Sequence, residues 1–173
     1  MVVAITLPLL LAVAVAVLGI LGRTGGEPAA ETGPLALAPV TAPDATGPDC
    51  AALLAALPAE LAAAGGPLPI RPLAGPAPPG VAAWAAAPRP VVLRCGLPRP
   101  AELTPTSSLL EINGVRWLRL DDGVPDPVVV TYIAVDRPVY PAVTTPTAAG
   151  SGPLQQLSDV VGQALPATPV RVR

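Results

Sequence analysis

The side chains that could carry out chemistry in this chain are few. Its 173 residues include two cysteines and ten arginines, but no histidine and no lysine. Without histidine, neither a Ser-His-Asp nor a Cys-His nucleophile can form, and histidine metal sites are excluded. A nucleophilic serine needs a base, and lysine is absent as well. We therefore expect no enzyme activity, no metal and no cofactor.

The two cysteines, Cys50 and Cys95, are expected to form one disulfide. Their spacing is far longer than the C-x-x-C of redox proteins, and two cysteines alone cannot complete a tetrahedral zinc site. An even number of cysteines in a chain with an export segment is typical of a structural disulfide. Closing a loop of about 46 residues would stabilise the fold by roughly 4 kcal/mol through chain entropy. Such a bond would place the domain outside the cytoplasm.

Four arginines, Arg71, Arg89, Arg94 and Arg99, flank the expected disulfide. Guanidinium groups bind carboxylates and phosphates, so a cluster here could hold an anionic polymer or a lipid head group. The alternative is that all four are ordinary solvated side chains. The net charge of −2 and the pI near 5.0 argue against a nucleic-acid partner, because nucleic-acid binding requires a basic surface.

Asp121, Asp122 and Asp126 lie together in the segment LDDGVPDP. Three carboxylates in a turn could bind Ca²⁺. The segment lacks the EF-hand pattern, however, and Asp-Asp-Gly is ordinary turn chemistry, so we favour a turn. Trp84 and Trp117 are interpreted as core residues rather than as platforms for a sugar.

Residues 1–22 are expected to be a transmembrane anchor. Residues 2–22 carry no charge and would span about 30 Å as a helix, the thickness of the bilayer core. A cleaved signal peptide is the alternative, but its apolar region is shorter. Arg23 by itself favours a cytoplasmic position for the residues after the anchor, whereas the expected disulfide favours the exterior. We expect a single-pass protein of the cell membrane with a cytoplasmic N-terminus and an extracytoplasmic C-terminal domain.

Residues 23–47 are expected to be a disordered linker, because they are rich in Gly, Pro, Thr and Ala and show no hydrophobic periodicity. A flexible coil of this length has a reach of roughly 30 Å, so the domain would stand clear of the membrane. Residues 48–166 are expected to form the folded domain, and residues 167–173 a frayed tail.

Coarse patterns place several elements in the domain. Residues 49–64 show leucines at helical spacing, with a proline that kinks the helix. Residues 65–80, rich in Gly and Pro, indicate a loop or polyproline II. Residues 81–87 are expected to form a helical turn, and residues 90–95 a strand.

The clearest local signal is a β-hairpin over residues 109–120. The Asn-Gly pair at 113–114 is the preferred sequence for a two-residue type I′ turn. This turn places Glu111 opposite Arg116, so we expect an ion pair across the two strands.

Residues 127–135 and 138–144 are expected to be another pair of strands. Pro138 and Pro141 have no N–H to donate, so the second strand should lie at an edge of the sheet. Residues 153–164 show helical spacing. The expected fold is α+β: a small, mainly antiparallel sheet of about five strands with two flanking helices.

Four segments together resemble a known family: Cys50 followed by LLAALP, then AAWAAAPRPVVLRCG, NGVRW and DRPVYPAV. They are similar to the domain of unknown function 3515 family, a group of small actinobacterial proteins, over about residues 48–165. The resemblance implies a membrane-anchored, extracytoplasmic protein but no activity, so it transfers no functional residues. One departure is Ala85, where a glycine is expected after the tryptophan.

These features favour a non-enzymatic, membrane-anchored extracytoplasmic module that interacts with cell-envelope proteins or polymers. The alternative is a small-molecule or anion-binding domain at the outer membrane surface, which would use the arginines near the disulfide.

Overall fold

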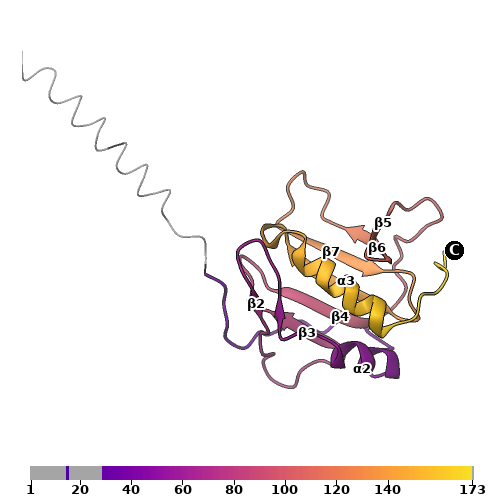
Figure 1. Cartoon of the computed structure of the whole chain (residues 1–173), viewed down its shortest axis with the longest axis horizontal. Coiled ribbons are helices and arrows are strands. Elements are labelled where there is room, and N and C mark those ends of the chain that lie inside the picture. The colour runs from indigo at the N-terminus through magenta and orange to yellow at the C-terminus, as the bar shows by residue number, and fades with distance from the viewer. Residues whose placement is uncertain (1–14, 16–28, 173) are drawn as a thin grey trace, which may run out of the picture.

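The computed structural model describes Val15 and residues 29–172 of the chain. The expected anchor, residues 1–22, lies outside the described residues apart from Val15. Within the part that is described, no helix combines the length and apolar character needed to cross a bilayer. Residues 48–165 form an α+β domain, as predicted (Figure 1).

The domain is built on a six-stranded antiparallel sheet with the strand order β3-β4-β8-β7-β6-β5. Its strands are β3 (Val81–Trp84), β4 (Val91–Leu97), β5 (Leu109–Ile112), β6 (Val115–Leu120), β7 (Val129–Ala134) and β8 (Tyr140–Pro146). Two shorter strands, β1 (Glu60–Leu61) and β2 (Leu68–Pro69), form a separate antiparallel pair.

Two helices, α2 (Pro48–Ala55) and α3 (Gly152–Ala164), pack on one face of the sheet. In Figure 1, α3 crosses in front of the strands and α2 lies below it. A short 3₁₀ helix, η1 (Thr147–Ala149), leads from β8 into α3. The two flanking helices that the sequence predicted are therefore both present.

The main core lies between these helices and the sheet, and two fully buried tryptophans belong to it. The indole nitrogen of Trp84 donates to the carbonyl oxygen of Pro58 at 3.1 Å. The indole nitrogen of Trp117 donates to Ser158 Oγ at 3.0 Å. The interpretation of both tryptophans as core residues is confirmed.

A second, smaller core lies on the opposite face of the sheet. Leu118, Ile133 and Ala142 from three neighbouring strands pack there against Leu103, which belongs to the loop before β5. The helices contribute no buried residue to this core, so loops and the C-terminal residues cover it.

Residues 166–172 lie against this second core, whereas the sequence predicted a frayed tail from residue 167. Thr168 N donates to the carbonyl oxygen of Asp136 at 2.9 Å, and Val170 packs against the apolar cluster. These two contacts, together with a hydrogen bond from Arg99 Nε to the carbonyl oxygen of Arg171 at 3.0 Å, hold a stretch that has no regular secondary structure.

The predicted hairpin is confirmed in its register. Ile112 pairs with Val115 and Glu111 with Arg116, and Arg116 Nε lies 3.7 Å from Glu111 Oε2. The turn residues 113 and 114 have φ values of 49° and 75°, as a type I′ turn requires.

Two local predictions are wrong. The first helix ends at Ala55 rather than at residue 64, because Pro58 cannot continue it and the following residues pair as β1 and β2. Residues 81–84 form strand β3, which pairs with β4 along its whole length, and not a helical turn. Alanine favours helices, but strand pairing overrides this weak preference.

The prediction that the prolines place β8 at a sheet edge is also wrong, since β8 lies between β4 and β7. Pro138 precedes the strand. Pro141 lies opposite the point where the register of β4 shifts between Arg94 and Leu97, and the pairing with β7 ends at Ala142. The missing N–H of Pro141 therefore falls where the ladders are interrupted.

Candidate functional site

Residues 29–47, which we call the N-terminal segment, lie against the domain. In Figure 1 this indigo segment starts at the left of the domain and leads into α2. The prediction of a disordered linker over residues 23–47 is therefore wrong for residues 29–47, because named side chains and backbone groups hold them. Residues 23–28 lie outside the described residues.

Arg71 holds the beginning of the N-terminal segment. Its side chain is only 5% exposed, and its Nε donates to the carbonyl oxygen of Gly33 at 2.7 Å. Its Nη2 forms an ion pair with Glu31 Oε2 at 3.0 Å, but the Glu31 side chain is 82% exposed, so this pair contributes little. Arg71 N donates to the carbonyl oxygen of Ala83 in β3 at 2.7 Å. The side chain of Arg71 thus binds the N-terminal segment, while its backbone N–H binds the sheet.

Backbone pairing continues this attachment. Leu35 N donates to the carbonyl oxygen of Pro72 at 2.8 Å, and Ala74 N donates to that of Leu35 at 2.9 Å, which makes a parallel bridge. Further along, Arg94 Nη2 of β4 lies 3.5 Å from the carbonyl oxygen of Ala38. The segment is thus bound at successive points rather than at one.

The end of the N-terminal segment fits around Gly96 of β4. Asp44 N donates to the carbonyl oxygen of Gly96 at 3.2 Å. A Cβ at Gly96 would lie 2.3 Å from Ala45 N, and one at Gly80 would lie 3.0 Å from Ala45 Cβ. Both glycines have positive φ, +82° and +72°, so glycine is required for conformation and for space. Together they make room for the buried Ala45.

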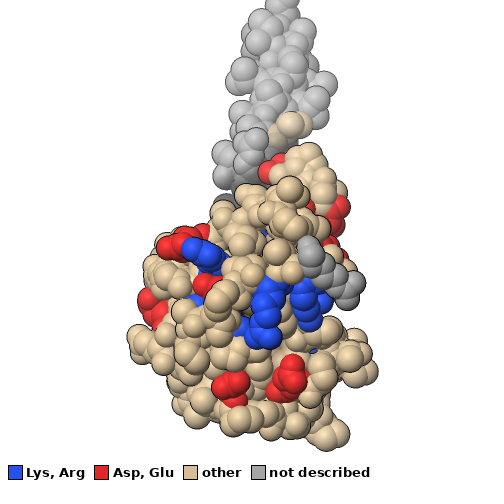
Figure 2. All heavy atoms as spheres, turned by 90° about the vertical axis from the view of Figure 1, so that its right-hand side faces the viewer, with Lys and Arg blue, Asp and Glu red and all other residues tan. Residues whose placement is uncertain are grey.

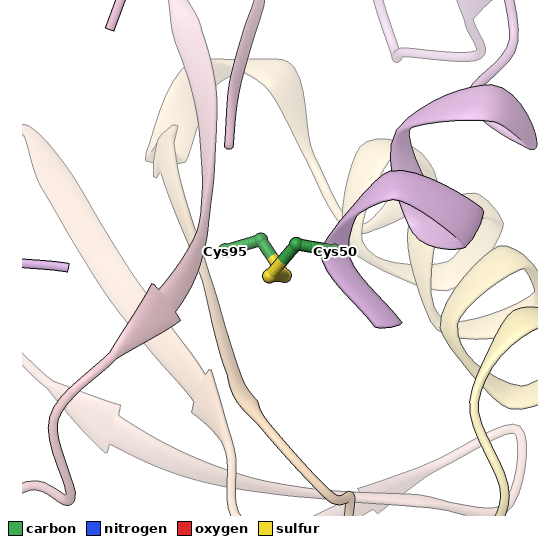
Figure 3. The surroundings of a disulfide bond; sticks show 2 residues. All are labelled: Cys50 and Cys95. Carbon is green, nitrogen blue, oxygen red and sulfur yellow. A yellow bond between two sulfur atoms is a disulfide. The ribbon is translucent and has the colours of Figure 1, made fainter. Parts of the chain in front are cut away.

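The predicted disulfide is confirmed, and it follows directly after the N-terminal segment. Cys50 of α2 and Cys95 of β4 point toward one another between the helix and the strand (Figure 3). Their Cα atoms are 5.6 Å apart, and both residues are buried. Because Cys95 precedes Gly96, the covalent link and the docked segment meet on the same strand.

The four arginines that flank the disulfide serve different parts of the chain. Arg71 and Arg94 bind the N-terminal segment. Arg99 Nε donates to the carbonyl oxygen of Arg171 at 3.0 Å, and its Nη2 donates to the loop before β5, whereas Arg89 is exposed. Burial lowers the pKa of Arg94 from its ordinary value, yet a guanidinium group stays charged. Three of the four guanidinium groups therefore join segments of this same chain.

The acidic residues after β6 form a turn, the interpretation that the sequence favoured. Asp121 Oδ1 accepts from Gly123 N at 3.0 Å, and Asp122 Oδ1 accepts from Val124 N at 3.4 Å. Asp121 Oδ2 also lies 2.9 Å from Arg119 Nη2. Among the described residues, no group of three or more His, Cys, Asp or Glu side chains is placed to hold a metal ion.

Charged side chains are interspersed on the face that carries the C-terminal end. Figure 2 shows acidic and basic side chains there in small separate groups, between wide areas of uncharged residues. The whole chain has a net charge of only −2. This face therefore lacks the extended basic surface on which nucleic-acid binding depends.

Two shallow hollows flank Ala148 at one end of the sheet. The first, of about 380 Å³, is lined by the start of the N-terminal segment, the β1–β2 loop and residues 85–87. The second, of about 430 Å³, is lined by Pro88, Arg119 and residues 125–128. Most of their lining is Ala, Gly and Pro, so they offer shape but few polar groups to a ligand.

These features define a small α+β domain that is cross-linked by one disulfide and whose N-terminal segment is part of the fold. The chain belongs to the family described as Protein of unknown function (DUF3515), which it matches over residues 5–170. The family resemblance seen in the sequence motifs is thus confirmed. No curated protein and no solved structure matches the chain.

Proposed function

We propose that the chain is a non-enzymatic module, anchored in the cell membrane by residues 1–22, that contacts other cell-envelope components from the outer side. The observation that carries this proposal is the buried Cys50–Cys95 bond. Structural disulfides form and persist in oxidising compartments and are rare in the cytosol. The uncharged run of residues 2–22 supplies a means of attachment there.

The use of the polar side chains within the fold supports a non-enzymatic role. Arg71, Arg94 and Arg99 donate to backbone carbonyl groups, and the first two aspartates after β6 close their own turn. These residues stabilise the fold. The anion-binding alternative would need guanidinium groups that face a common ligand, whereas Arg71, Arg94 and Arg99 each donate to a different carbonyl group of the chain itself.

Protease treatment of intact cells tests the proposed location. The chain carries a C-terminal epitope tag, and a cytoplasmic protein in the same cells serves as the control. We expect loss of the tag signal from intact cells while the control survives. Protection of the tag until the cells are lysed would show that the domain is not outside.

Chemical crosslinking of the native envelope, followed by affinity purification, tests the proposed interaction. We expect discrete crosslinked species that contain envelope proteins or polymers. Recovery of the uncrosslinked chain alone, under conditions that crosslink a known envelope complex, would contradict a role as an interaction module.

A further inference from the structure

The docked N-terminal segment fixes where the domain meets the apolar run. Only residues 23–28 separate Gly22, at the end of that run, from Ala29, the first residue of the segment. Six residues cover at most about 22 Å, even when fully extended. This inference rests on the proposed anchor: with residues 2–22 in a bilayer, the end of the domain that carries Ala29 lies at the bilayer surface.

That end, which we call the proximal end, consists of residues 29–32, 63–69, 85–89, 121–128 and 147–149. Most of its parts border the two hollows described above. Ala148 borders both hollows, of which one reaches Ala29 and the other reaches Val128. In Figure 1 the proximal end lies at the left, where the described chain begins and where α3 starts.

Backbone hydrogen bonds tie the proximal end together. Ala64 N donates to the carbonyl oxygen of Ala149 at 3.1 Å, and Thr147 N donates to that of Val128 at 3.1 Å. The 3₁₀ helix η1 is thus hydrogen-bonded to the β1–β2 loop through Ala149 and to the β6–β7 loop through Thr147. These loops would therefore contact a bilayer surface as one unit.

The chemistry of the proximal end suits a lipid surface. Val124 and Val128 are 48% and 58% exposed, and both lie in the β6–β7 loop among prolines. The carboxylate of Asp121 is paired with Arg119, and that of Glu31 with Arg71. In the described part of the chain, three charged residues of the proximal end, Arg89, Asp122 and Asp126, have no ion-pair partner, and their sum of −1 gives no net attraction to an anionic membrane.

We propose that the proximal end rests on the lipid head groups, with Val124 and Val128 at the bilayer interface. Two exposed valines would bind a free protein to a membrane only weakly. Attachment through a short linker makes the contact intramolecular, however, with an effective concentration in the millimolar range. A weak surface is then sufficient to hold the domain in one orientation.

Single-cysteine labelling tests this orientation in the full chain. Both native cysteines are engaged in the disulfide, so Val124→Cys, Val128→Cys or Val172→Cys each adds one free thiol for a bimane fluorophore. Val172 is the matched control because it is 44% exposed and lies away from the proximal end. It follows Arg171, whose carbonyl oxygen accepts a hydrogen bond from Arg99, beyond the far end of β4. The labelled chains are inserted into phosphatidylcholine vesicles with brominated acyl chains.

We expect about a twofold loss of emission at positions 124 and 128 relative to position 172, because interfacial contact brings the label close to the upper acyl chains. Equal emission at all three positions would overturn the proposal. Quenching that appears only after anionic lipid is added would do the same, since the net negative charge of the proximal end disfavours that surface. Aqueous iodide serves as a second quencher. Labels at positions 124 and 128 that are shielded from iodide but not quenched by bromine would indicate contact between copies of the chain, and this result would also overturn the proposal.

Vesicle flotation, done first, separates this inference from the proposed function. A chain that does not float with the vesicles would contradict the proposed anchor itself. A chain that floats, but whose labels at positions 124 and 128 behave like the label at 172, would leave the anchor intact and contradict only the orientation.

Discussion

Arg71 Nε donates to the carbonyl oxygen of Gly33 at 2.7 Å, across 38 positions of the chain. The guanidinium group is buried, whereas its acidic partner Glu31 is exposed to solvent. A segment composed largely of Pro, Gly and Ala is thereby ordered by a side chain that belongs to the domain. The contact makes the N-terminal segment part of the folded unit and shortens the linker to the apolar run.

Replacing Arg71 should release the start of the N-terminal segment. Arg71→Met removes the donor to Gly33 and leaves its carbonyl oxygen without that partner, at a cost of about 1–3 kcal/mol. We expect faster amide hydrogen exchange over residues 29–37 and a lower denaturant midpoint. Glu31→Gln is the control and should change exchange there very little, because the exposed ion pair contributes little. Unchanged exchange in Arg71→Met would show that the backbone bridge alone holds the segment.

Adding one methyl group at Gly96 should separate the N-terminal segment from β4. Gly96→Ala places a Cβ 2.3 Å from Ala45 N at φ +82°, and we expect a loss of about 3 kcal/mol or more in unfolding free energy. Gly123→Ala is the matched control, because its φ is +75° but nothing lies within 4 Å of the added Cβ. It should cost only about 1 kcal/mol. Equal losses in the two variants would mean that strain, and not the close contact, is the cause.

Removing the disulfide should lower stability without changing the fold. The double variant Cys50→Ser, Cys95→Ser opens a loop between residues 45 positions apart, and we expect a loss of about 4 kcal/mol in urea unfolding. Reductant should produce the same loss in the unmodified chain and none in the double variant. A double variant as stable as the oxidised parent would contradict a stabilising role for this bond.

The hydrogen bond between Trp117 and Ser158 should be important for the main core. Ser158 Oγ accepts from Trp117 Nε1 at 3.0 Å and donates to the carbonyl oxygen of Leu154 at 2.7 Å. Ser158→Ala leaves a buried indole N–H without this acceptor, and we expect a loss of about 1–3 kcal/mol in the free energy of unfolding.

The matched control for this change is Ser151→Ala. Ser151 precedes α3, but its side chain makes no capping hydrogen bond, and it is exposed. We expect almost no change in thermal unfolding for this variant. If the two alanine variants melted at the same temperature, the Trp117–Ser158 bond would be unimportant for stability.

Local sequence signals predicted the elements that local interactions determine. The Asn-Gly pair specifies a type I′ turn, and this turn alone sets the register of β5 and β6. The two cysteines predicted their bond, because no other partner exists in the chain. The helix near the C-terminus followed from its apolar spacing, within one residue of its observed start.

The wrong predictions concern residues whose structure depends on distant partners. Residues 81–84 are strand because β4 pairs with them, and no local pattern indicates this partner. Pro141 is tolerated inside the sheet because β4 changes register opposite it. The N-terminal segment is ordered by Arg71, Gly80 and Gly96, which lie far from it in the sequence. Gly96 lies inside β4, as glycines at close backbone approaches often do, but the predicted strand ended at residue 95 and did not include it.

The Cys50–Cys95 link has a mechanical consequence. A force that pulls on the N-terminus would act first on the Arg71 contacts, then on the Leu35 bridge and then on the packing of Ala45, all of which are non-covalent. Peeling would stop at Cys50, because its sulfur is bonded to β4, and β4 lies between β3 and β8. Tension could therefore release residues 29–49 while the strands and α3 stay folded. The chain can then lengthen under load and fold back when the load is removed.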